Sequence, residues 1–157
     1  MHPKPQPLHS YRADPAVPTF DDGGVVVVLD GACALCSGFA RWLAHRDPGR
    51  SVRFVPVATP LGQALLRHYG LDPEDPQSWL VLRGGRAFGA LDAVVEVTRA
   101  LHVARALRLL GVLPPACRDW IYARVARNRY VFGQGDICGL PDPQVRQRLI
   151  DADQQSV

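Results

Sequence analysis

Two cysteines separated by two residues are the part of this sequence best suited to do chemistry. They lie in the run Cys33-Ala34-Leu35-Cys36. If this run opens a helix, both thiols lie on one helical face about 5 Å apart, a separation that suits a disulfide. Cys33 then stands at the helix N-terminus, where unpaired backbone N–H groups and the helix dipole stabilise a thiolate. The thiolate is the attacking form, so we expect Cys33 to attack a substrate disulfide and Cys36 to resolve the mixed disulfide, with no bound cofactor.

The residues on both sides predict the strand and the helix that this arrangement needs. Val25 to Leu29 is a β-branched run that is too short for a helix and is typical of a strand buried on both faces. From Cys36 to Leu43, apolar residues recur every three or four positions, which is the period of one helix face. Asp47-Pro48-Gly49 ends this helix, because proline cannot continue it. The two thiols are therefore predicted to lie at a strand-to-helix junction.

The elements that follow complete a recognisable order. Residues 52–57 predict a second strand, and Thr59 followed by proline predicts a capped helix start. Residues 78–82 and 87–89 predict two strands joined by a tight turn, and Asp92 is a candidate cap for the next helix. The order is β-α-β-α-β-β-α, with parallel strands first and an antiparallel hairpin last. It predicts the thioredoxin-like α/β fold, which has a four-stranded mixed sheet.

The chain divides into three parts on composition and periodicity. Residues 1–22 are rich in proline and lack periodicity, so we expect a flexible or loosely docked N-terminal arm. Residues 23–104 hold the predicted thioredoxin-like core. Residues 105–157 contain further helical patterns without a linker, and we expect a C-terminal helical extension packed on the core.

Bulk composition describes one ordinary globular domain. The 157 residues are 47% hydrophobic and 21% charged, and the net charge of +3 gives no indication of nucleic-acid binding. The longest apolar stretch, residues 94–113, is interrupted by charges, which argues against a membrane span. No export signal is recognisable, so the expected location is the cytoplasm, where structural disulfides are rare. Four cysteines then indicate working, metal-binding or buried thiols.

Two alternative roles for the cysteines stay open. Cys33 and Cys36 could form half of a zinc site with Cys117 and Cys138, although those two are too far apart in sequence to form a second pair of ligands. Alternatively, the two thiols are inert packing groups, since free cysteine is often buried. We favour the redox pair and expect Cys117 and Cys138 to be incidental, with no metal site.

Asp30 precedes the cysteine pair and has two possible roles. Its carboxylate could accept the proton of Cys36 during resolution. It could equally cap the turn that follows the first strand, as aspartate often does. The residues do not decide between these roles.

The segment around the thiols resembles a known family. Its residues run Asp30-Gly31-Ala32-Cys33-Ala34-Leu35-Cys36, which resembles the D-G-x-C-x-x-C signature of the DCC family of thiol-disulfide oxidoreductases. The resemblance extends to Gly89-x-x-Asp92-Ala93 and to the segment from Tyr122 to Tyr130. It implies that Cys33 and Cys36 are the redox pair and that Asp30 is the family's acidic position. Ala34 stands where proline is frequent, so the redox potential is not implied.

Pro76 is a further candidate that comes from the resemblance to thioredoxin-like proteins. A cis-proline before the third core strand faces the dithiol in such proteins and helps to hold the substrate backbone. Pro76 lies two residues before Ser78, near that place. An ordinary trans turn is the alternative, because cis bonds are uncommon even before proline.

The expected function is therefore thiol-disulfide exchange, with a protein or small-molecule disulfide or thiol as substrate. A thioredoxin-shaped binding or adaptor module without redox turnover is the alternative from another class. The residues do not identify the substrate or the direction of electron flow.

Overall fold

One mixed four-stranded sheet forms the scaffold of the molecule. The computed structural model describes residues 2–31, 33–75, 79–102, 109, 111–128 and 142–150. The strands are β1 (Val25–Leu29), β2 (Val52–Pro56), β3 (Leu80–Arg83) and β4 (Arg86–Gly89). They lie in the order β2-β1-β3-β4, with β1 parallel to β2 and antiparallel to β3, and with β3 antiparallel to β4. The predicted mixed sheet with a final hairpin is confirmed.

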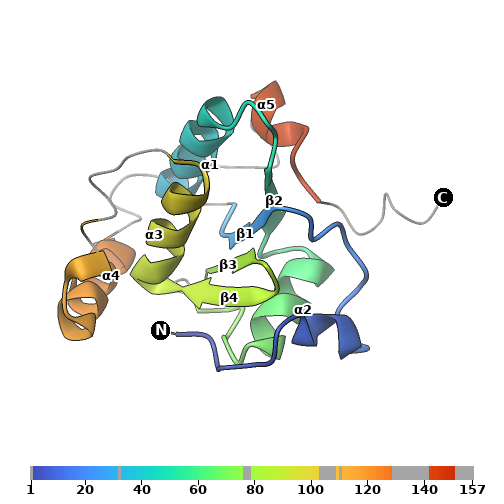
Figure 1. Cartoon of the computed structure of the whole chain (residues 1–157), viewed down its shortest axis with the longest axis horizontal. Helices are drawn as coiled ribbons and strands as arrows, with labels where there is room; N and C mark the ends of the chain where they lie inside the picture. The colour runs from blue at the N-terminus through green and yellow to red at the C-terminus, as the bar shows by residue number, and fades with distance from the viewer. Residues whose placement is uncertain are drawn as a thin grey trace.

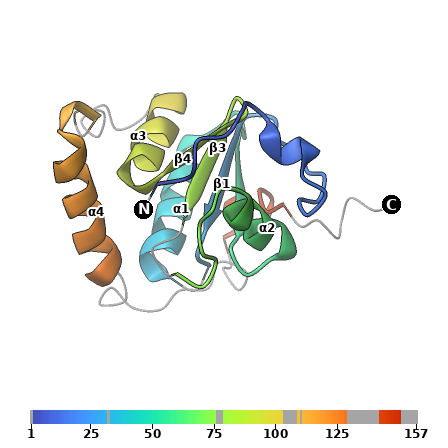
Figure 2. The same ribbon diagram turned by 90° about the horizontal axis from the view of Figure 1, so that it is seen from below.

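Helices cover both faces of this sheet (Figures 1 and 2). Helices α1 (Ala34–Arg46) and α3 (Ala90–Ala100) cover one face, and α2 (Pro60–His68) covers the other. From β1 to α3 the elements follow the order β-α-β-α-β-β-α, which confirms the thioredoxin-like α/β fold. Within the described ranges, no helix has both the length and the apolar character needed to span a bilayer.

Strand β1 contributes to the core on both of its faces, as its β-branched run predicted. Val26 and Val28 belong to the same buried cluster as Leu65 of α2. Val27 points to the opposite face and belongs to a second buried cluster with Leu43 of α1. Because helices pack on both faces of β1, the residues that follow this central strand are held in a fixed position at its C-terminal end.

Of the two predicted helix caps, one is confirmed and the other is wrong. The Thr59 hydroxyl accepts a hydrogen bond of 3.1 Å from the Gly62 N–H, so the predicted cap of α2 is confirmed. Asp92 does not cap α3, because β4 runs directly into that helix and Gly89 occupies the N-cap position. Asp92 instead lies in the first turn of α3.

The N-terminal arm is docked on the core over its described part, residues 2–22. Tyr11 and Phe20 are only 2% and 9% exposed and belong to the buried cluster on the α2 side of the sheet. The His9 N–H donates a 2.9 Å hydrogen bond to the carbonyl of Gly85, in the turn between β3 and β4. Gly85 has a φ of 76°, and a side chain there would collide with the His9 ring. The burial of Tyr11 and Phe20 could not be predicted, because isolated aromatic residues without periodicity give no sign of burial.

The described parts of the C-terminal extension pack on the core. Helix α4 (Pro115–Asn128) packs against α3, and the short helix α5 (Pro143–Arg146) packs against α1. After α5 the chain pairs with the outer edge of β2. The Phe54 N–H donates to the carbonyl of Arg148 at 2.8 Å, and the Ile150 N–H donates to the carbonyl of Phe54 at 2.9 Å. These bonds satisfy backbone groups on an otherwise unpaired edge.

Candidate active site

Cys33 lies between the end of β1 and the first residue of α1. It is the N-cap residue of α1, with an extended backbone (φ −91°, ψ 120°), and its carbonyl accepts a 2.9 Å hydrogen bond from the Ser37 N–H. Its own N–H donates to the carbonyl of Asp30 at 3.4 Å, within the turn that follows β1. The Ser37 hydroxyl donates to the carbonyl of Gly31 at 3.2 Å and ties the helix to the same turn. The chain thus holds Cys33 at the predicted helix N-terminus.

The electrostatic surroundings of this helix start favour an anion. The first N–H groups of any helix have no acceptor within the helix, and they carry the positive end of its dipole. No acidic side chain lies in the first turn of α1 to offset that charge.

The two thiols differ in exposure. Cys33 is fully buried, whereas Cys36 is half-buried in the first turn of α1. Position in the helix favours Cys33 as the thiolate, whereas exposure favours Cys36 as the sulfur that a substrate first meets. The sequence indicated only the first of these two properties.

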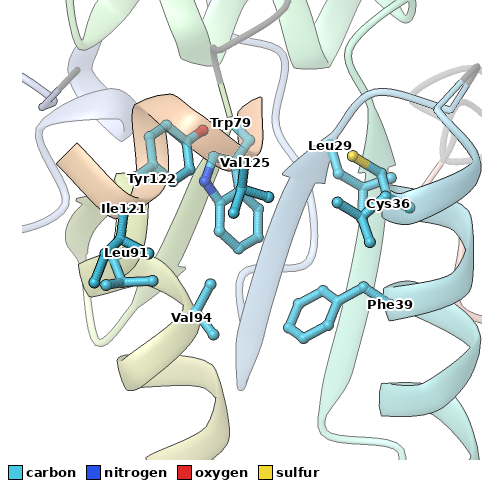
Figure 3. A pocket seen from close by; sticks show the side chains of 10 residues that line it. Leu29, Cys36, Phe39, Trp79, Leu91, Val94, Ile121, Tyr122 and Val125 are labelled. Carbon is cyan, nitrogen blue, oxygen red and sulfur yellow. The ribbon is translucent and has the colours of Figure 1, made fainter. Parts of the chain in front are cut away.

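Cys36 lines an apolar cavity of about 310 Å³ (Figure 3). One wall comes from the end of β1 and from α1, through Leu29, Leu35, Cys36 and Phe39. The opposite wall comes from α3 and α4, through Leu91, Val94, Ile121, Tyr122 and Val125. Trp79, just before β3, also lines the cavity. The C-terminal extension is therefore part of the site, because α4 closes one side of the space beside the dithiol.

Aromatic rings support the α1 wall of the cavity. The rings of Phe39 and Trp79 meet edge to face, with centroids 6.0 Å apart and planes at 79°. Phe39 also stacks on Trp42 at 5.9 Å, and the Arg46 guanidinium lies 4.6 Å from the centre of the Trp42 ring. The Trp79 indole nitrogen is buried and has no hydrogen-bond partner among the described residues. Packing on both of its sides holds Phe39 in place next to Cys36.

Sequence reasoning missed the cavity. The only local signal was on α4, where Ile121, Tyr122 and Val125 have the spacing of one helix face. That spacing indicates an apolar contact but does not say with which element. The cavity arises because α4 packs beside α3, a contact between distant parts of the chain.

The other predicted residues are placed as follows. Asp30 is half-buried at the end of β1, and its backbone carbonyl accepts the bond from Cys33 described above. Cys117 is exposed near the start of α4 and is absent from the cavity lining. Pro76 and Cys138 lie outside the described residues. In the part of the chain that the structure describes, no group of three or more His, Cys, Asp or Glu side chains is arranged to hold a metal ion.

Comparison with known families supports the interpretation of this junction. Residues 27–134 match the family model described as DCC1-like thiol-disulfide oxidoreductase, and this match includes both cysteines, α4 and the sheet except for the first two residues of β1. The chain belongs to the DCC1-like thiol-disulfide oxidoreductase family. The predicted membership is thereby confirmed, and the match extends over the elements that form both cavity walls.

Two relatives lie in distant organisms. The chain is 32% identical over 127 residues to "Uncharacterized protein YuxK" of Bacillus subtilis (strain 168), covering 80% of this chain and 93% of that protein. It is 30% identical over 123 residues to the chloroplastic DCC family protein At1g52590 of Arabidopsis thaliana, covering 76% of this chain and 72% of that protein. No solved structure matches the chain. The family therefore indicates the type of chemistry and leaves the substrate open.

Proposed function

We propose that this DCC1-like protein exchanges thiols and disulfides through Cys33 and Cys36. The observation that carries the proposal is the dithiol at the β1–α1 junction, with Cys33 at the helix N-terminus and Cys36 beside an open cavity. A thiol pair one helical turn apart can close a disulfide, and the helix start favours the reactive anion.

The proposed reaction proceeds in two balanced steps. A protein thiolate attacks one sulfur of a substrate disulfide; a mixed disulfide forms, the substrate S–S bond breaks, and the leaving thiolate takes up a proton. The second protein thiol then loses its proton and attacks the protein sulfur of the mixed disulfide, which releases the other half of the substrate as a thiol. The substrate gains two electrons and two protons, and the protein pair becomes a disulfide.

The order of attack is part of the proposal. Cys33 is proposed to attack and Cys36 to resolve, because the helix N-terminus stabilises a thiolate at Cys33. The full burial of Cys33 requires that the site opens before a substrate reaches it. The greater exposure of Cys36 favours the opposite order, in which Cys36 attacks first. The trapping experiment below distinguishes these two orders.

Asp30 and Pro76 have proposed supporting roles. Asp30 is proposed to accept the proton that Cys36 loses during resolution, which its place in the turn before Cys33 supports. Pro76 is proposed to contact the substrate backbone, on the resemblance to thioredoxin-like proteins alone. Replacing Asp30 by Asn is expected to slow resolution more than attack, and rapid-mixing measurements of the two steps would test this.

A second candidate function is that of a binding module. The surface beside and before α4 exposes large apolar side chains, with Trp120, Leu109 and Val112 67%, 69% and 81% exposed. Such groups suit contact with a partner protein. If a partner bound equally well to a variant lacking both Cys33 and Cys36, binding without redox turnover would be the better description.

A trapping experiment tests the redox proposal. Reduced wild type, Cys33→Ser, Cys36→Ser and the exposed control Cys117→Ser are each mixed with a small disulfide, and the products are identified by mass spectrometry. We expect wild type and Cys117→Ser to form the Cys33–Cys36 disulfide. Cys36→Ser should stall as a mixed disulfide on Cys33, whereas a faster stall in Cys33→Ser supports initial attack by Cys36. Unchanged turnover in both single variants would contradict the proposal.

The expected compartment is also a proposal. We propose the cytoplasm, because a dithiol that must return to its reduced form after each exchange suits a reducing compartment. Fractionation of cells that produce the tagged protein, with a redox-sensitive label on its cysteines, tests this directly.

A further inference from the structure

We infer that the cavity beside Cys36 binds the organic group of a small, uncharged aromatic disulfide or thiol. This inference rests on the proposed redox function and adds the class of substrate. It concerns the same site, because Cys36 is the thiol of the pair that lines the cavity.

The lining of the cavity selects against charged substrates. Among the described lining residues none is charged, and their polar atoms are confined to Cys36, Trp79 and Tyr122. Burying a carboxylate or an ammonium here would leave it without a partner of opposite charge, which is costly. Asp92, which follows the lining residue Leu91 in α3, is already engaged by Arg118 of α4. A charged disulfide such as oxidised glutathione is therefore a poor match.

The size of the cavity indicates a small occupant. Its volume of about 310 Å³ lies at the lower end of the range for small-molecule sites, roughly 300–1,000 Å³. A cavity of about 150 Å³ already holds benzene, so this space has room for one or two aromatic rings attached to sulfur, whereas a folded protein surface does not enter it.

The placement of the side chains points to an aromatic occupant with one acceptor atom. Figure 3 shows Cys36 and Phe39 on one side, with α3 and α4 residues opposite. Phe39 and Trp79 already meet edge to face, a geometry that a third ring can extend. The indole N–H of Trp79 is buried and lacks a partner among the described residues, so a ring nitrogen or carbonyl of the ligand can accept its hydrogen bond once the Trp79 ring turns toward the cavity.

The first experiment compares disulfides that differ in charge. Reduced protein reacts with dithiodipyridine, which is aromatic and neutral, with dithionitrobenzoate, which is aromatic and anionic, and with oxidised glutathione. Each rate constant is divided by that of a free dithiol with the same reagent, which removes intrinsic reactivity. We expect the normalised rate for dithiodipyridine to exceed the other two by about tenfold, the scale of discrimination that an apolar pocket supplies.

The second experiment uses matched valine variants. Val125 lines the cavity at an exposed rim (45% exposed), so glutamate there can be accommodated without unfolding. Val125→Glu should reduce the preference for dithiodipyridine about tenfold, and Val125→Leu should retain it. Val112 is 81% exposed and lies outside the cavity, so Val112→Glu is the matched control and should change nothing.

The outcomes separate this inference from the proposed function. If no disulfide reacts through Cys33 and Cys36, the proposed function itself fails. If all three react with equal normalised rates, or if Val125→Glu and Val112→Glu behave alike, exchange stands and the aromatic site is wrong. A faster normalised reaction with a disulfide in an unfolded apolar protein would also overturn the inference, because the cavity would then accept a protein side chain. A dimer that Val125→Glu dissociates would overturn it as well, because the cavity would then bind a second copy of the chain.

Discussion

Arg118 of α4 forms an ion pair with Asp92 of α3. The pair joins the two helices that make up one wall of the cavity beside Cys36. Asp92 also lies in the first turn of α3, where a negative charge is favoured by the helix dipole. The carboxylate predicted as a helix cap therefore acts in the structure as the anchor of α4.

Replacing Asp92 should change the reaction rate at the cavity more than the free energy of unfolding. Asp92→Asn is expected to reduce the rate with dithiodipyridine about threefold, because partly exposed ion pairs contribute at most about 1 kcal/mol. The rate with oxidised glutathione should stay unchanged, since that reagent is not expected to use the cavity. Stopped-flow measurement of both rates tests the prediction. Glu96→Gln is the control, because Glu96 is also on α3 but pairs with Arg83 of β3. Equal effects of the two substitutions would contradict it.

Arg148 connects the end of the chain to the end of α1. Its side chain is buried and donates hydrogen bonds to the carbonyls of Ala44 (2.6 Å) and Asp47 (2.7 Å). The Asp47 carboxylate lies 3.9 Å from the guanidinium and accepts a bond from the Val52 N–H at 2.8 Å. One arginine thus satisfies carbonyls at the C-terminal end of the helix that carries the cysteines.

We predict that Arg148→Met lowers the free energy of unfolding by about 3 kcal/mol. The substitution leaves two buried carbonyls without donors and removes the charge facing Asp47. Urea unfolding followed by circular dichroism measures the loss. Arg146→Met provides the comparison, because Arg146 is exposed on the same segment. A midpoint for Arg148→Met equal to that of Arg146→Met would show that the bonds contribute nothing.

Asp22 holds the N-terminal arm in its folded shape and makes that shape sensitive to acid. It accepts hydrogen bonds from the Tyr11 hydroxyl at 2.6 Å and from Arg12 at 2.8 and 2.9 Å. Burial by itself would raise the pKa of Asp22, but these bonds and the charge of Arg12 outweigh it, and the pKa falls below its usual value. Burial, followed by the bond to Asp22, raises the pKa of Tyr11, so its hydroxyl stays protonated.

The sign of the pH effect follows from this lowered pKa. Asp22 contributes stability above its unfolded pKa of about 4 and loses it as pH falls through the lower folded value. We predict that Asp22→Asn is about 1 kcal/mol less stable at neutral pH and loses less stability on acidification than wild type. Unfolding curves at a series of pH values test this, with the exposed neighbour Asp21→Asn as control. Identical acid profiles for wild type and Asp22→Asn would refute it.

Local features were predictable from the sequence, and contacts between distant segments were not. The β1 strand and the Thr59 cap depend on neighbouring residues, so their patterns sufficed. The position of Cys33 at the start of α1 was likewise a matter of local sequence. Its burial relative to Cys36 depends on the packing of the folded chain, which the spacing of the two cysteines does not encode.

Tyr11 and Arg148 likewise make contacts with distant segments that local sequence does not predict. Tyr11 is an isolated aromatic residue in a proline-rich segment, and only the folded sheet shows that it is buried. Arginine is usually a surface residue. Arg148 is nevertheless buried, and its guanidinium donates hydrogen bonds to the carbonyls of Ala44 and Asp47 at the end of α1. Neither position carries a periodic signal.

Ser10, His68 and Asp14 form a hydrogen-bonded chain between the arm and α2. The Ser10 hydroxyl lies 2.8 Å from His68 Nε2, and His68 Nδ1 lies 2.6 Å from the Asp14 carboxylate. The same order of groups occurs in serine hydrolases. The adjoining cavity is lined by His68 and Asp14 but not by Ser10, so a molecule bound there would not touch the hydroxyl. The hydrogen bond to His68 lowers the pKa of Asp14, which keeps the carboxylate charged.

We therefore predict that this chain of groups docks the arm and does not hydrolyse esters. His68→Gln should release the arm and speed tryptic cleavage after Arg12 about fivefold, the effect of losing roughly one hydrogen bond. His102→Gln, at an exposed histidine, should leave the cleavage rate unchanged. Hydrolysis of nitrophenyl acetate by wild type should equal that of Ser10→Ala. A rate that falls in Ser10→Ala, together with labelling of Ser10 by a fluorophosphonate, would show instead that the hydroxyl is a nucleophile, and docking would no longer account for the geometry.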